Sequence, residues 1–102
     1  MNNIQTILRD WYIVKILDEK QSLIGQVLWA FVVEDNTGRF NIGDYLCTSL
    51  IVKINNNLII TASGSEYIVE GIGKEFEADI AELEQLRRGH SPFQVSRLRK
   101  VH

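Results

Sequence analysis

The chain has 102 residues, of which 45% are hydrophobic and 24% are charged, and its formal net charge at pH 7 is -2. This length supports one hydrophobic core but not two, so we expect a single domain over residues 1–102. The small negative charge gives no overall attraction to nucleic acid or to an anionic membrane surface. Binding of either kind would need a local basic patch.

The single cysteine and the first residues bear on the compartment. Cys47 cannot form an internal disulfide and stands in an apolar strand pattern, which favours a small buried side chain in a reducing environment. The first five residues lack the basic start and apolar core of a signal peptide, and no apolar run approaches the roughly 20 residues of a membrane span. We therefore expect a cytoplasmic protein of bacterial or phage type.

The beginning of the chain predicts a short helix over residues 3–10, because four apolar residues recur at the i, i+3, i+4 and i+7 spacing of one helix face. They are Ile4, Ile7, Leu8 and Trp11. Residues 12–17 are rich in β-branched and aromatic side chains and predict the first strand.

Residues 26–34 are apolar in both alternating sets of side chains, which predicts a strand covered on both faces. One set is Val27, Trp29, Phe31 and Val33, and the other is Leu28, Ala30 and Val32. Residues 45–54 become apolar on both sides at their far end, from Leu50 onward. We expect these two stretches to be neighbouring central strands, covered either by helices of this chain or by another subunit.

Short turns separate the strands that follow. Residues 55–57 are three asparagines and residues 63–65 are Ser-Gly-Ser, both suited to tight turns between strands at 45–54, 58–62 and 66–72. Loops this short allow only antiparallel neighbours.

After residue 73 the period becomes helical. Residues 74–88 predict a helix with acids in its first turns and arginines at its end, followed by Gly89. Its apolar stripe is Phe76, Ile80, Leu83 and Leu86. Ser91 and Gln94 have the spacing of a capping box, with Pro92 at the first helical position, and predict a second helix that runs to residue 100.

These elements predict an α+β fold. We expect a bent antiparallel sheet of about five strands, which could close toward an SH3-like or OB-like half barrel, with an N-terminal helix and a C-terminal helix pair. The predicted core consists of Ile7, Trp11, Ile13, Trp29, Phe31, Val33, Leu46, Leu50, Val52, Ile60, Val69, Ile80 and Leu83.

Motifs of catalysis and metal binding are weak. The glycine-rich turn at 71–73 could cradle a phosphate on its backbone N–H groups, but Phe76 stands where a third glycine would be expected. The acids Glu34, Asp35 and Asp44 lack the spacing of a calcium loop. Since no nucleophile with a base and an orienting partner can be identified, we predict no enzyme, no metal and no cofactor.

Two groups of residues are candidates for interaction. Arg39 and Phe40 stand in a loop and are residue types enriched at interface hot spots, although Phe40 could equally be part of the core. Arg97, Arg99 and Lys100 concentrate positive charge at the carboxyl end and could contact a phosphate backbone, or pair with the acidic helix before them.

Residues 37–40, 43–45 and 86–92 read TGRF, GDY and LRRGHSP. In these segments the chain resembles small uncharacterised bacterial proteins carried on mobile gene cassettes. The resemblance implies an accessory role and assigns no activity, cofactor or site residue.

The leading hypothesis is therefore a non-enzymatic protein-interaction module, most simply a homodimer, that uses surplus apolar strand surface or the Arg39 and Phe40 loop. A first alternative is a nucleic-acid-binding accessory protein that uses the basic carboxyl end. A second is a small-ligand domain with a pocket lined by Trp29 and Tyr45.

Overall fold

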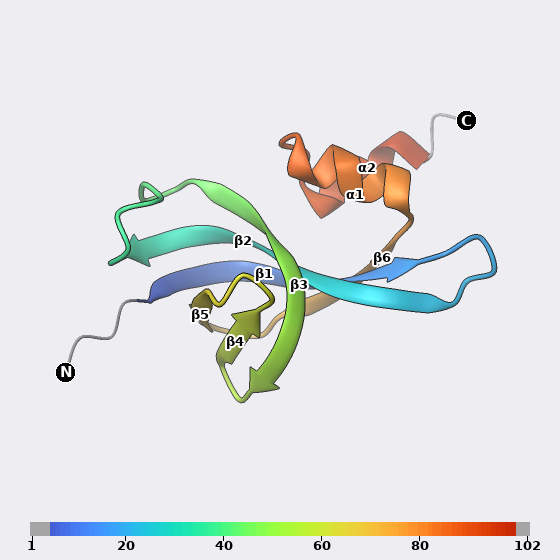
Figure 1. Cartoon of the computed structure of the whole chain (residues 1–102). Coiled ribbons are helices and arrows are strands. Elements are labelled where there is room, and N and C mark those ends of the chain that lie inside the picture. Colours follow the sequence, from blue (N-terminus) through green and yellow to red (C-terminus); the bar gives the residue numbers. More distant parts are fainter. Residues whose placement is uncertain (1–4, 100–102) are drawn as a thin grey trace.

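The computed structural model describes residues 5–99, in which one mixed six-stranded sheet is followed by two helices (Figure 1). The elements are β1 (Thr6–Leu17), β2 (Leu23–Asp35), β3 (Tyr45–Asn55), β4 (Leu58–Thr61), β5 (Glu66–Val69), β6 (Lys74–Ala78), α1 (Ile80–Arg87) and α2 (Pro92–Arg99). The predicted α+β class and the C-terminal helix pair are confirmed. The predicted all-antiparallel sheet of five strands is wrong, because β1 pairs in parallel with both β5 and β6.

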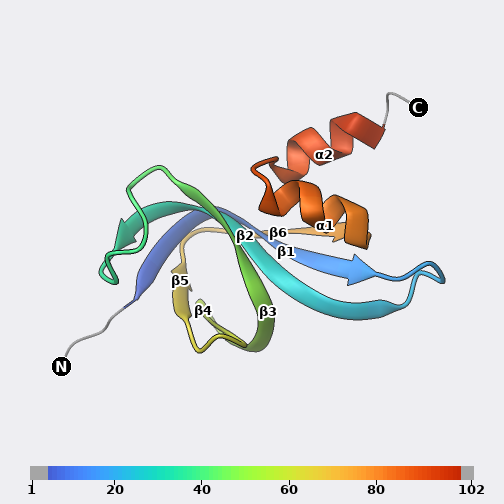
Figure 2. The ribbon, with the colours of Figure 1, turned by 45° about the horizontal axis from the view of Figure 1, so that its top comes forward.

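The sheet curls on itself without making a clear barrel of the SH3-like or OB-like kind. Antiparallel pairs join β1 to β2, β2 to β3, β3 to β4 and β4 to β5, and β5 returns to β1 over three residue pairs. Beyond that short closure, β1 continues beside β6, and the β1–β2 hairpin extends away from the curled part (Figures 1 and 2).

The predicted N-terminal helix is wrong, because β1 begins at Thr6 and pairs with β2 and β5 from that residue. A bulge explains the helix-like spacing. Asp10 and Trp11 together oppose the single residue Ala30 of β2, and Asp10 has a φ of 50°. An extra residue turns all later side chains to the opposite face, so Leu8 and Trp11 contact the same cluster although they are three residues apart.

The predicted helix over residues 74–88 is wrong in its first part. Lys74–Ala78 is β6, which pairs in parallel with β1, and the helix begins only at Ile80. Asp79 caps it, because its carboxylate accepts the backbone N–H of Glu82 while the Glu82 side chain accepts the N–H of Asp79. This later start leaves Ile80, a predicted core residue, more than half exposed.

The sequence signals at the end of α1 and the start of α2 are confirmed. Gly89 follows the α1 cap with a φ of 122°, a left-handed conformation that favours glycine. The Ser91 hydroxyl accepts the backbone N–H of Gln94, and the Gln94 side chain accepts the N–H of Ser91. This capping box places Pro92 at the first position of α2.

Two hydrophobic clusters lie on opposite faces of β1 and β2. The inner cluster, inside the curl of the sheet, is Leu8, Leu28, Ala30, Val32, Leu46, Ile59, Tyr67 and Val69. The outer cluster, beneath α1 and α2, is Val14, Ile16, Val27, Trp29, Ala78, Leu86 and Val95 (Figure 2). The prediction that the middle of β2 is covered on both faces is therefore confirmed, and helices of the same chain provide the outer cover.

For β3 the same prediction is wrong. The turn at residues 55–57 does join β3 to β4 as antiparallel neighbours, and β5 follows β4 in the same way. The apolar far end of β3 nevertheless faces solvent, and the predicted core residues Leu50 and Val52 are exposed. The other predicted core residues, apart from Ile80, are buried or half-buried.

Candidate functional site

The first candidate surface lies where β2 and β3 diverge. β2 pairs with β3 only between Val27 and Phe31, so residues 23–26 have β1 on one edge and, among residues 5–99, no strand on the other. From Ile51 onward β3 pairs with β4 and leaves its edge toward β2 unpaired. Two free strand edges thus border one fork, and free edges carry backbone groups that can bond to another strand.

Aliphatic side chains line this fork and define what we call the apolar groove. Its side chains and exposed fractions are Leu23 (52%), Ile24 (51%), Leu50 (48%), Val52 (63%) and Ile54 (51%). The space between the strands measures about 510 Å³ and is lined by residues 23–26 and 51–54, of which Lys53 alone is charged. Exposed apolar side chains are common singly, but a contiguous group along two free edges indicates an interaction surface.

The groove continues toward the helices. A second hollow of about 660 Å³ lies between the β1–β2 turn and the start of α1, and Leu17, Ile24 and Ile80 line it. Ile24 borders both hollows, and the second hollow is also lined by the polar turn residues 18–21 and by Asp79.

Sequence reasoning missed the residues at the start of β2. Leu23 and Ile24 directly follow a charged turn, and this apolar pair was the only local signal. Their exposure depends on β3 leaving β2, which no local pattern reports.

The predicted Arg39 and Phe40 loop is held by Asp35, the last residue of β2. The Asp35 carboxylate accepts the backbone N–H groups of Thr37, Arg39 and Phe40, at 3.1, 2.7 and 2.7 Å, and the hydroxyl of Thr6 at 2.8 Å. Desolvation raises the pKa of Asp35, but the hydrogen bonds from Thr37, Phe40 and Thr6 outweigh it and hold the pKa well below its ordinary value.

Within this loop Phe40 packs against the inner cluster. The Arg39 guanidinium lies over the Phe40 ring, 5.0 Å from its centroid, and donates to the hydroxyls of Thr37 and Ser65. Arg39 therefore makes contacts within its own chain, and the pair has a structural role.

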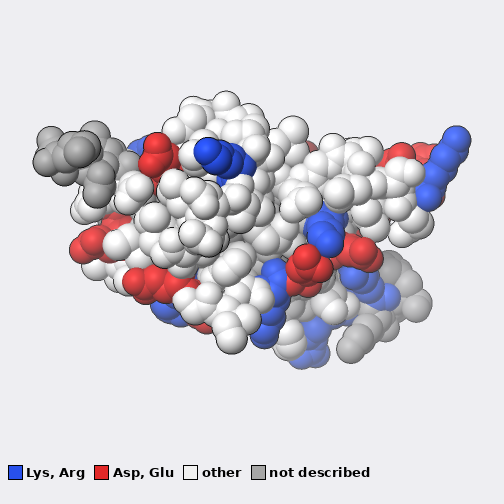
Figure 3. Space-filling model, turned by 90° about the horizontal axis from the view of Figure 1, so that it is seen from below, with Lys and Arg blue, Asp and Glu red and all other residues white. Residues whose placement is uncertain are grey.

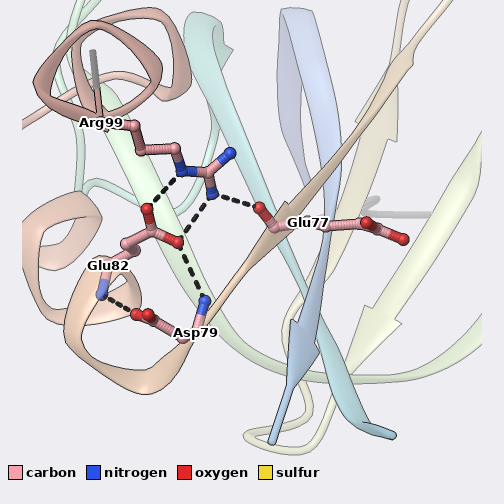
Figure 4. Close-up of polar contacts among 4 residues, drawn as sticks. All are labelled: Glu77, Asp79, Glu82 and Arg99. Carbon is pink, nitrogen blue, oxygen red and sulfur yellow. Dashed lines mark hydrogen bonds and ion pairs between the residues drawn. The ribbon is translucent and has the colours of Figure 1, made fainter. Parts of the chain in front are cut away.

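Arg99, one of the predicted basic residues, connects three elements (Figure 4). It forms an ion pair with Glu82 of α1, donates to the backbone oxygen of Glu77 in β6 at 2.6 Å, and lies over the Phe76 ring. The hydrogen bond from Arg99 lowers the pKa of Glu82, and the bond to Glu82 raises the pKa of Arg99. This residue fastens α2 to the rest of the fold.

Arg97, another of the predicted basic residues, takes no part in the contacts of Arg99. Arg97 is exposed, with its guanidinium 5.8 Å from the centroid of the Phe93 ring, and Lys100 lies outside the described residues. On the face seen in Figure 3, most Lys and Arg side chains stand near acidic ones or apart from one another, and uncharged residues cover the middle. This face carries no continuous basic surface.

Trp29 and Tyr45, the predicted lining of a pocket, lie face to face. The two rings stack on each other, with centroids 6.1 Å apart and planes 13° apart. Trp29 is buried and Tyr45 is exposed. Cys47 is half-buried in the outer cluster, where burial raises the pKa of its thiol against the opposing effect of Arg87.

In the part of the chain that the structure describes, no group of three His, Cys, Asp or Glu side chains could hold a metal ion. The acids Asp35 and Asp44 accept backbone N–H groups of their own loop. Neither described helix reaches the length and apolarity that crossing a membrane requires.

Comparison with known proteins gives one match. A family model described as "Domain of unknown function (DUF6957)" matches residues 2–85, a range that contains the apolar groove. No curated protein and no solved structure matches the chain.

Proposed function

We propose that this chain, which belongs to the DUF6957 family, is a non-enzymatic protein-interaction module that forms a homodimer through the apolar groove. The observation that supports this proposal is that two unpaired strand edges and five exposed aliphatic side chains occur together where β2 and β3 diverge. An apolar edge of this kind can gain both backbone hydrogen bonds and buried area from a second strand.

The size of the groove fits such an interface. From their exposed fractions, the five side chains offer on the order of 500 Å² per copy, most of the roughly 800 Å² that each partner contributes to a stable interface. The neighbouring hollow with Leu17 and Ile80 would supply further apolar contact at the rim.

A second copy of the chain is the favoured occupant. Residues 23–26 read Leu-Ile-Gly-Gln and contain no charge and no proline, the devices by which monomeric proteins protect an exposed edge. Two such edges can pair antiparallel across a twofold axis, which lets the same side chains cover each other without any other sequence. Lys53 is the one charge in the groove, so the cost of bringing two copies together is small.

The test is the mass of the protein in solution. Ile24→Lys and Val52→Lys each place a charge in the groove, and light scattering should show the wild type shifting from monomer to dimer as concentration rises while both variants stay monomeric. Ile42→Lys is the matched control, because Ile42 is 80% exposed in the loop before β3 and should leave the dimer intact.

A wild type that stays monomeric at every concentration would contradict the homodimer. So would a dimer that survives both groove substitutions. The cytoplasmic location and the accessory role on mobile gene cassettes remain part of this proposal, and fractionation of the native host tests the first of them.

A further inference from the structure

A third hollow, between β1 and the start of α2, is lined mainly by aromatic side chains. It measures about 300 Å³, at the lower end of the range for small-ligand sites. Trp11, Tyr12, Trp29, Phe31 and Phe93 line it, with Lys74 at the start of β6. We call it the aromatic pocket, and it shares no residue with the apolar groove.

The bulge in β1 builds one wall of this pocket. Asp10 adopts a positive φ that side chains other than glycine rarely take, and the bulge directs Trp11 over the turn at residues 71–73. A Cβ on Gly73 would lie 2.4 Å from Cζ3 of Trp11, so only glycine allows the indole to lie there. The Trp11 indole also donates to the backbone oxygen of Gly71 at 3.2 Å. The glycines that suggested a phosphate turn therefore hold Trp11 instead.

Trp29 is the most deeply buried of the rings that line the pocket. Trp29 is 2% exposed, and its Nε1 is buried without a hydrogen-bond partner. Tyr12 and Phe31 stand nearly at right angles to the indole, with centroids 5.9 and 5.1 Å away.

The rim combines apolar and cationic groups. Two apolar side chains of the rim are exposed to solvent, Phe93 at 64% and Ile72 at 97%. Arg9 lies over Phe31, Lys74 over Tyr12 and Arg97 over Phe93, at 5.3, 5.9 and 5.8 Å from the ring centroids. All three rings line the pocket.

The charges decide which ligand the pocket suits. Three cations lie over its rings, and the acid Asp10 forms an ion pair with Arg9, so a cationic ligand meets charge repulsion. A flat ring with a negative charge beside it meets aromatic side chains and the cations Lys74 and Arg97, while the acid Asp10 is paired with Arg9. Aromatic side chains interleaved with Lys and Arg are the combination by which proteins stack nucleobases.

We propose that the aromatic pocket binds the base of a nucleotide, stacked against the exposed aromatic rings, with its phosphate beside Lys74 and Arg97. The volume admits one base with its substituents, so the ligand is either a free nucleotide or a single base of a single-stranded nucleic acid. The predicted nucleic-acid role of the basic carboxyl end would then rest on Arg97 and the aromatic pocket, because Arg99 is engaged elsewhere.

Intrinsic fluorescence gives a direct test, because both tryptophans of the chain line the pocket. The full chain is titrated with adenosine monophosphate in one arm and with a short single-stranded oligothymidylate in the other. Saturable quenching in either arm supports the proposal, and the arm that binds at lower concentration identifies the source of the base. Inorganic phosphate, which carries the charge alone, should give no saturable change.

Two variants and one control locate the binding. Phe93→Ala should weaken it about tenfold, the usual effect of losing one stacking ring, and the residue is exposed enough for the fold to tolerate the change. Lys74→Glu should weaken binding and flatten its dependence on salt. Lys53→Glu makes the same charge change in the apolar groove and should bind like the wild type.

Circular dichroism of each variant verifies the fold. The proposal is overturned if neither arm shows saturable quenching, or if Phe93→Ala and Lys74→Glu bind as tightly as the wild type.

Discussion

The middle of β2 and the far end of β3 are both apolar on both sides, yet Val27 and Leu28 are fully buried whereas Val52 and Ile54 are more than half exposed. For β2, the curl of the sheet closes the inner face, and α1 and α2 close the outer face. β3 leaves β2 after Leu50 to pair with β4, and Ile51 still packs against the inner cluster while Val52 and Ile54 are left exposed. A strand that is apolar on both faces therefore predicts that other elements should bury both faces. The topology decides whether elements of the same chain do so.

The largest expected effect is on the free energy of unfolding, when one apolar residue in each of these two strands is replaced by alanine. Leu28→Ala removes a fully buried side chain from the inner cluster and should lower the free energy of unfolding by about 2–5 kcal/mol. Val52→Ala should change it by no more than about 0.5 kcal/mol at concentrations below those at which the proposed dimer forms. Urea denaturation measures both values, and equal losses would remove the distinction between the strands.

The two ends of β2 sharpen the comparison, because Leu23 begins it at an open edge and Asp35 ends it in a network of hydrogen bonds. Asp35→Asn should lower the free energy of unfolding at pH 7 by about 1–3 kcal/mol, since it weakens several bonds to a partly buried carboxylate. Asp44→Asn is the control, because that carboxylate accepts one backbone N–H, from Asn41.

The pH dependence gives Asp35 a second signature. Its pKa is lower in the folded than in the unfolded chain, so its contribution is present above the ordinary carboxylate pKa of about 3.9. That contribution is lost as pH falls from there through the folded pKa. Urea denaturation at pH 7 and pH 3 should show a larger loss for the wild type than for Asp35→Asn, and parallel losses would count against the role of the carboxylate.

The smallest expected effect concerns α2, one of the two helices that cover the outer face of β2. Arg99→Ala removes the ion pair with Glu82 and the bond to β6, and should cost about 1 kcal/mol or less because the arginine is partly exposed. Arg88→Ala, which breaks a more exposed pair with Glu84 at 3.9 Å, is the control and should cost less still. We expect Arg99→Ala, but not Arg88→Ala, to expose Trp29 to a fluorescence quencher. That result would show that the contacts of Arg99 keep α2 over the outer cluster. Equal protection of Trp29 in both variants would assign that cover to the packing of Val95 alone.

Local signals predicted much of the fold. The turns at 55–57 and 63–65, the Ser91 capping box and the helix end at Gly89 were all readable, because each depends on residues within a few positions of one another. The capping pair of Asp79 and Glu82 was equally local, but the apolar stripe that began at Phe76 masked it. The parallel pairs of β1 with β5 and β6 join residues about sixty positions apart, and no local pattern reports them.

The candidate sites follow the same division. Arg39 and Phe40 were chosen by residue type, and in the structure Arg39 contacts Thr37 and Ser65 while Phe40 packs against the inner cluster. The apolar groove and the aromatic pocket depend on where β3 departs from β2 and where the β1 bulge places Trp11. The aromatic residues were visible in the sequence, but their convergence was not.

The amino-acid sequence by itself determined which segments are extended or helical at most positions, where the chain turns, and that β2 must be buried on both faces. Those properties follow from side-chain alternation, capping and turn chemistry, which act over a few residues. Only the tertiary structure decided that Leu23, Ile24 and Val52 stay uncovered and that Trp11 and Phe93 share one hollow. Exposure depends on which distant strand or helix lies alongside, and one extra residue in β1 is enough to turn all later side chains to the other face.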